Sequence, residues 1–131
     1  MEICARSIIV SAGLVSLMAN DDYNCALAHA TCYGLSLFEH VEKNCLHGDL
    51  VAYGALVQLM VDGQADKAKE LQQFLRTLGT PVTLREMNVP LDRSLLNDCL
   101  IEATTGPDMA HIPYPITPDM VFDAMTRVEN L

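Results

Sequence analysis

Apolar side chains recur along most of the chain at the three- and four-residue spacing of helices, and no segment of useful length alternates as a strand would. The pattern predicts helices over residues 7–19, 22–38, 49–61, 65–78 and 92–103, a short turn over 83–87 and a last helix from 117. The fourth of these segments is amphipathic, with a charged outer face. The expected fold is all-α, a bundle of five to six helices forming one helical domain over residues 1–131.

Capping and turn residues mark the ends of these helices. The expected N-caps, whose side-chain oxygens accept backbone N–H groups, are Asp22, Asp49, Asp92 and Thr117. Gly63 and Gly79 are expected to end two helices, because glycine readily adopts the left-handed conformation found there. Residues 43–48 and the proline-rich residues 104–118 are expected to be connections.

The first apolar segment, residues 7–19, has two interpretations. Its hydropathy is that of a signal peptide, but Glu2 precedes it and Arg6 is the only base before it. Its apolar residues also fit one helix face, and it is too short to span a bilayer unaided. We therefore expect a buried core helix. Because no cap or turn precedes this helix, the chain begins as if it continued from a longer protein.

The charge and cysteine content narrow the classes of function. The net charge is −9, with 17 acidic against 8 basic residues, which argues against nucleic acid and anionic membranes as partners. Five cysteines without a CxxC pair are not the pattern of a secreted disulfide framework. We expect a reducing compartment, the cytoplasm.

Histidine and cysteine gather in one apolar stretch of the sequence. Cys25, His29 and Cys32 are spaced at i, i+4 and i+7, so they are expected on one helix face, and His47 follows close to the start of the next helix. Ligands from one helix joined by one from the next commonly form a metal site. The alternative is ordinary packing, since buried cysteine behaves as a small apolar residue. Spacing alone leaves both open, together with a structural zinc site that uses Cys25, Cys32 and both histidines.

Four segments resemble successive parts of one known family. They read AHATCYGLS, LHGDLVAYGALVQLMV, FLRTLGTPVTLREM and HIPYPITPDMVFDAM. They resemble the C-terminal helical domain of glycerol dehydrogenase, in the iron-containing alcohol dehydrogenase superfamily, and the similarity covers essentially the whole chain.

The resemblance implies a metal- and substrate-binding role. Family members hold zinc, or often iron, in the helical domain, and NAD in an N-terminal α/β domain. Their two motif histidines are metal ligands and correspond to His29 and His47. The third family ligand, an aspartate, and the nucleotide-binding domain would precede this chain. NAD would therefore bind only if a partner domain were supplied.

Two positions depart from the family pattern. Tyr23-Asn24 replaces a Gly-Gly pair, and Cys32 replaces a frequent third histidine, which makes Cys32 a candidate substitute ligand. We expect a dehydrogenase part, inactive alone, that acts on a small polyol in the complete enzyme. The alternative is a non-catalytic remnant that serves as a metal-binding or protein-interaction module. The expected partners are a nucleotide-binding chain or a second copy of this one.

Overall fold

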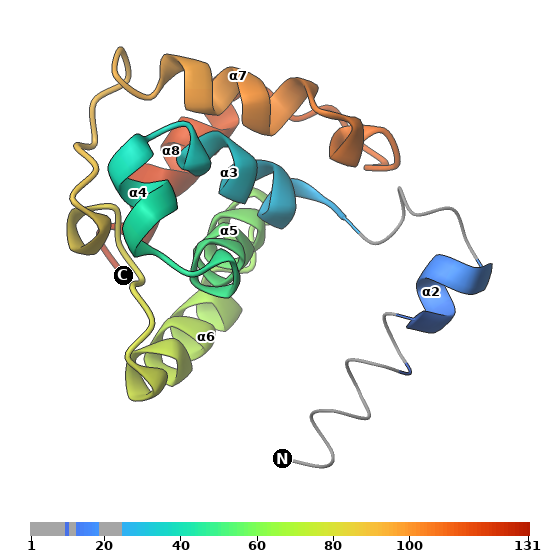
Figure 1. The fold of residues 1–131 in the computed structure, drawn as a ribbon, viewed down its shortest axis with the longest axis horizontal. Coiled ribbons are helices and arrows are strands. Elements are labelled where there is room, and N and C mark those ends of the chain that lie inside the picture. Colours follow the sequence, from blue (N-terminus) through green and yellow to red (C-terminus); the bar gives the residue numbers. More distant parts are fainter. Residues whose placement is uncertain (1–9, 11–12, 19–24) are drawn as a thin grey trace.

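Every regular element of the described part of the chain is helical. The computed structural model describes residue 10, residues 13–18 and residues 25–131, and it contains no strand in them (Figure 1). The α-helices are α2 (Gly13–Met18), α3 (Leu27–Ser36), α4 (Glu39–Asn44), α5 (His47–Val61), α6 (Ala65–Leu78), α7 (Asn97–Thr105) and α8 (Pro118–Val128). There are also two 3-10 turns: η3 (Arg85–Met87) precedes α7 in the sequence, and η4 (Pro107–Met109) follows it. The all-α prediction is confirmed.

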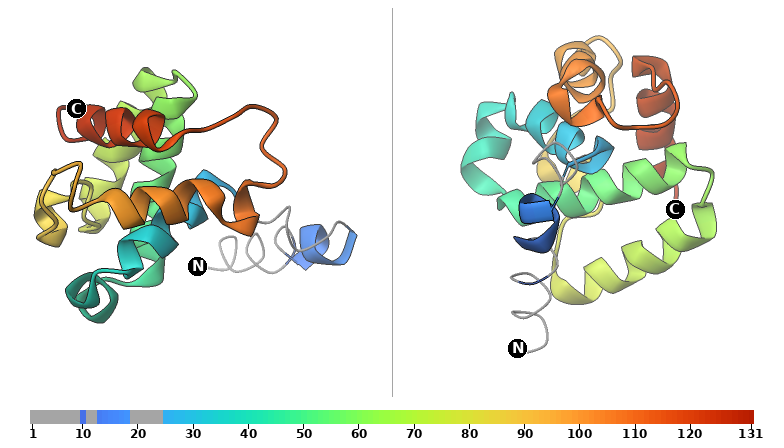
Figure 2. Two further views of the ribbon diagram at one scale, coloured as in Figure 1. Left: turned by 90° about the horizontal axis from the view of Figure 1, so that it is seen from above. Right: turned by 90° about the vertical axis from the view of Figure 1, so that its right-hand side faces the viewer.

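Helix α5 lies at the centre of the body that α3 to α8 form. It packs against α3, α6 and α8, and α3 packs in turn against α7 (Figures 1 and 2). Side chains from these helices meet in one apolar core, whose largest fully buried members include Leu27, Leu35, Tyr53, Leu56, Leu100 and Met125. Burial of this kind stabilises the body by about 1.5–3 kcal/mol for each large apolar side chain.

Two glycines let the backbones of neighbouring helices approach closely. A Cβ atom on Gly54 of α5 would lie 2.2 Å from the carbonyl oxygen of Ala28 in α3. A Cβ atom on Gly34 of α3 would lie 2.4 Å from the carbonyl oxygen of Cys99 in α7. Only glycine fits at these two contacts, so α3 is held against both neighbours at a separation that any larger residue would increase.

Several helix boundaries follow the capping residues as expected. Helix α6 has the predicted bounds and ends at Gly79, which has a φ of 76°. Helix α5 ends at Val61, two residues before Gly63, which has a φ of 71°. The Thr117 hydroxyl accepts the Met120 N–H at 3.3 Å, as the N-cap of α8.

Other boundaries were predicted wrongly. Helix α3 begins at Leu27 after extended backbone at Ala26, and the proposed cap Asp22 lies outside the described residues. Helix α4 lies beyond the predicted end of that helix and extends into residues 43 and 44, which were expected to be part of a connection. Asp49 is the third residue of α5, where its carboxylate accepts the Leu46 N–H at 3.4 Å. Asp92 caps a separate turn that precedes α7, accepting from the N–H groups of Ser94 and Leu95.

Helix α2, the described part of the core helix predicted over residues 7–19, is not buried; residues 7–9, 11–12 and 19 lie outside the described residues. Figure 1 shows it away from the body formed by α3 to α8. Leu17 and Met18 are 85% and 83% exposed, and Leu14 is 49% exposed. None of the described helices has both the length and the apolar content needed to cross a membrane.

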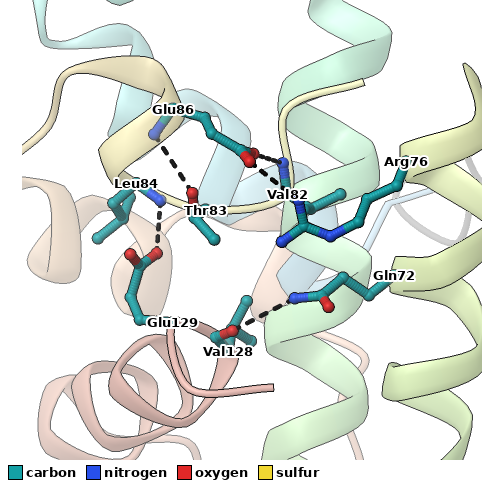
Figure 3. Close-up of polar contacts among 8 residues, drawn as sticks. All are labelled: Gln72, Arg76, Val82, Thr83, Leu84, Glu86, Val128 and Glu129. Atoms are coloured by element: carbon teal, nitrogen blue, oxygen red, sulfur yellow. Dashed lines mark hydrogen bonds and ion pairs between the residues drawn. The ribbon is translucent and has the colours of Figure 1, made fainter. Parts of the chain in front are cut away.

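A network of polar contacts holds residues 80–89 against α6 and α8 (Figure 3). Glu86 accepts the Val82 N–H at 2.7 Å and the Arg76 guanidinium at 3.1 Å. Glu129 at the end of α8 accepts the Leu84 N–H at 2.5 Å. Burial acts to raise the pKa of Glu86, but the hydrogen bonds from Val82 and Arg76 outweigh it and lower the pKa below its ordinary value of 4.5.

Replacing Glu86 by glutamine is expected to reduce stability at neutral pH and to remove part of its pH dependence. A carboxylate with a lowered pKa in the folded state stabilises that state above its unfolded pKa, and the stabilisation is lost as pH falls through the folded value. The difference in free energy of unfolding between wild type and Glu86→Gln should therefore shrink as pH falls below 4.5. Urea titrations across this range measure it, and a difference that is constant with pH would contradict the role given to Glu86.

Candidate metal centre

The two motif histidines come together where α3 meets the start of α5. His29 lies in the first turn of α3, and His47 is the first residue of α5. Their ring centroids are 5.8 Å apart, with the ring planes at 45°. Their positions follow from packing, because α3 and α5 are pressed together at Gly54 and Ala28, one residue from His29.

Cys32 lies behind His47, inside the core. Its Sγ atom is 3.4 Å from Nδ1 of His47 and 4.0 Å from the His47 carbonyl oxygen. Burial raises the pKa of this thiol, and the nearby Ser36 hydroxyl offsets part of the effect. Without a metal the neutral thiol is therefore favoured over the thiolate, which is the form that binds metals.

The surroundings of the two imidazoles add residues that the sequence did not indicate. The Tyr33 ring lies 6.4 Å from the His47 ring, centroid to centroid. Asp108, in η4, lies close enough to Cys25 and Tyr33 to raise the pKa of both groups, after the larger effect of burial. Tyr33 follows His29 by four residues, so helical spacing could have identified it. Asp108 approaches only through the tertiary fold, and no local pattern marks it.

The cluster lies at the edge of the core, contrary to expectation. His47 is exposed, His29 is half-buried, and only Cys32 is buried. Cys25 precedes α3, so the predicted common helix face of Cys25, His29 and Cys32 does not exist. The candidate ligands therefore lie in different environments, since Cys32 belongs to the core, His47 to the surface, and Cys25 and His29 are partly buried.

The described residues supply two imidazole donors but not a complete ligand set. No group of three or more His, Cys, Asp or Glu side chains that could hold a metal ion occurs within them. Catalytic zinc sites usually have three protein ligands. The pair therefore fits a divalent metal only if a further donor comes from outside the described residues.

The pockets of the described body leave the histidine pair outside. A groove of about 610 Å³ lies between α4, α6 and η3, with His40, Cys45, Asp49 and Arg76 among its lining residues. A smaller cavity of about 230 Å³ lies between the start of α3 and residues 111–116. Neither is lined by His29 or His47.

Comparison with known proteins gives relatives of a single kind. No family model matches the chain. Hydroxycarboxylate dehydrogenase A of Escherichia coli (strain K12) is 33% identical over 126 residues, which cover 95% of the chain and 34% of that protein. Glycerol dehydrogenase of Thermotoga maritima is 29% identical, covering 95% and 35%. Glycerol dehydrogenase 1 of Schizosaccharomyces pombe is 27% identical, covering 95% and 28%.

These matches show what the chain is similar to over nearly its whole length. It is related, over nearly its whole length, to glycerol dehydrogenase and the iron-type alcohol dehydrogenases, as the motifs around His29 and His47 indicated. The chain spans about a third of the length of these relatives.

Proposed function

We propose that this chain forms the metal- and substrate-binding side of an NAD-dependent dehydrogenase that acts on a small polyol or a related alcohol. The observation that carries the proposal is the pairing of His29 and His47, at 5.8 Å between ring centroids. With metal–nitrogen distances of about 2.0–2.1 Å, two imidazoles bound to one ion have centroids roughly 5–6 Å apart. The pair is therefore spaced for a shared zinc or iron ion.

The residues of the chain have a limited part in such a reaction. When bound, the metal would act as a Lewis acid on the substrate hydroxyl, and NAD would accept the hydride. His29 and His47 would hold the metal, and the packing of α3 on α5 would fix their separation. Tyr33, whose ring lies 6.4 Å from that of His47, would limit the room for substrate on that side of the imidazole.

Exposed apolar side chains beside the histidines favour the view that another domain covers this face. Leu46, which precedes His47, is 74% exposed, and Tyr33 is 45% exposed. A nucleotide-binding chain or domain placed over this face would bury them and bring NAD to the metal. We also propose a cytoplasmic location, because the four described cysteines are free, as in a reducing compartment.

The purified 131-residue chain is expected to show no NAD-dependent oxidation of glycerol or small diols. Joining it to the N-terminal two thirds of the Thermotoga maritima relative should give turnover that a chelator abolishes. The same hybrid with His47→Ala should be inactive, whereas one with His40→Ala, an exposed histidine on α4, should retain its activity.

Two results would contradict the proposal. One is hybrid turnover that the His47→Ala substitution leaves unchanged. The other is a chain that is a stable homo-oligomer, takes up no metal and complements no nucleotide-binding domain. The second result would favour the alternative of a non-catalytic interaction module.

A further inference from the structure

The contact between Cys32 and His47 joins a buried thiol to an exposed imidazole. Cys32 is 1% exposed, and its sulfur lies within hydrogen-bonding range of two atoms of His47, Nδ1 at 3.4 Å and the carbonyl oxygen at 4.0 Å. Water has little access to the sulfur, so solvent does not compete for these contacts. The contact also crosses between elements, since Cys32 belongs to α3 and His47 begins α5.

These distances determine which ring nitrogen of His47 is available to a ligand. A neutral imidazole has one N–H and one nitrogen with a free lone pair, and a metal binds the lone pair. Nδ1 faces the sulfur in the core, so only Nε2, on the opposite side of the ring, remains for a metal.

The thiol group can satisfy both contacts in one arrangement. A thiol is a weak donor and its sulfur a weak acceptor. If the S–H group donates to the His47 carbonyl oxygen, the sulfur lone pair is free to accept the Nδ1–H of the same residue. The opposite arrangement, with the S–H directed at Nδ1, would leave the carbonyl contact unused and would put the proton of the ring on Nε2.

We propose that Cys32 is a positioning residue for His47, whose sulfur accepts the Nδ1–H of the imidazole and so leaves Nε2 with the lone pair that a metal requires. Metal-binding histidines commonly donate their other N–H to a neighbouring acceptor, which fixes the tautomer and the ring orientation. The metal part of this inference rests on the proposed function, whereas the tautomer of His47 does not.

The tautomer is tested on the metal-free chain. Long-range ¹H–¹⁵N correlation spectra of ¹⁵N-labelled chain, at a pH where the imidazoles are neutral, distinguish Nδ1–H from Nε2–H. His47 should be the Nδ1–H tautomer in wild type, and the Nε2–H form should increase in Cys32→Ala. The matched control, Cys45→Ala, removes a thiol two residues before His47 and should leave the spectrum of His47 unchanged.

Either of two results would overturn the inference. One is an Nε2–H tautomer of His47 in the wild-type chain, and the other is the same tautomer with and without the Cys32 thiol. If Cys32→Ala does not fold, the wild-type spectrum still decides the tautomer. Cys32→Ser, which retains an acceptor in the core, can then be used in place of the alanine variant.

The metal part is tested by titration with Co²⁺, followed by calorimetry and by absorbance. Loss of a group that orients a metal ligand typically weakens binding by about 10–100-fold, and we expect Cys32→Ala to do so and Cys45→Ala not to. A thiolate-to-cobalt absorption band that disappears in Cys32→Ala would make Cys32 a ligand and overturn its positioning role. If the wild-type chain binds no Co²⁺, the pair does not hold a metal without the further donor, and the tautomer spectra alone decide the role of Cys32.

Discussion

Replacing Gly54 by alanine is expected to lower the free energy of unfolding by about 3 kcal/mol, the upper end of the usual cost of overpacking a core. The added Cβ would lie 2.2 Å from the Ala28 carbonyl oxygen and 2.9 Å from two further backbone atoms of that residue. A backbone atom cannot move aside as the end of a flexible side chain can, so α3 and α5 would have to separate. Urea titration followed by far-UV circular dichroism measures the loss.

The same substitution at Gly48 is the matched control. Gly48 also lies in α5, but no atom lies within 4 Å of the Cβ it would gain. Alanine is a better helix former than glycine by up to about 1 kcal/mol, so Gly48→Ala should be neutral or slightly stabilising. Equal effects at the two positions would show that helix propensity, rather than the contact with Ala28, determines the response.

Replacing either His29 or His47 by alanine is expected to weaken zinc binding by at least about 100-fold, more than the loss of a group that only orients a ligand. Each substitution would leave one imidazole, and the described residues contain no group of three or more metal-binding side chains to compensate. Isothermal titration calorimetry with Zn²⁺ measures the change. The wild-type affinity should itself be modest, because a third protein ligand is lacking among the described residues.

His40→Ala provides the control for this experiment. His40 lies on α4, where its ring contacts Phe38 at 6.0 Å between centroids, and we assign it no ligand role. Its substitution should leave zinc affinity unchanged. Tight binding that survives His29→Ala would exclude His29 as a ligand and with it the assignment of the motif to a metal site.

Helix α6 shows what local pattern can predict. Its apolar face, its charged outer face and the glycine that follows all lie within residues 65–79, so its bounds followed from the sequence. Thr117 identified the start of α8 in the same way, through a contact within three residues. In both cases the determinants of the helix end lie next to it in the chain.

The wrong boundaries have a different physical origin. Residues 22–38 carry helical spacing throughout, but extended backbone at Ala26 delays the start of α3 until Leu27, and the backbone at Phe38 separates α3 from α4. Apolar content also misled the prediction for α2, since hydropathy indicates that a segment can be buried but not what covers it.

The proximity of the two candidate histidines was predictable from the sequence, but their environment was not. His29 and His47 were selected by family motifs, and the structure places their rings together. That His47 is exposed while Cys32 is buried depends on how α3 lies on α5, which spacing along one helix cannot give. The effect of Asp108 on the pKa of Cys25 and of Tyr33 joins residues about 80 apart and has no counterpart in the local sequence.

The close approach of α5 to Ala28 bears on how such a protein can change during evolution. The spacing of the two imidazoles is set by a contact between helix backbones, one residue before His29, and not by the segment that connects the two helices. Substitutions on the outer face of α4, where Glu39 and Lys43 are exposed, would alter the surface and leave that spacing intact, although Val41 of the same helix is buried in the core. We therefore expect this outer face to tolerate change, while at position 54 even one methyl group is excluded.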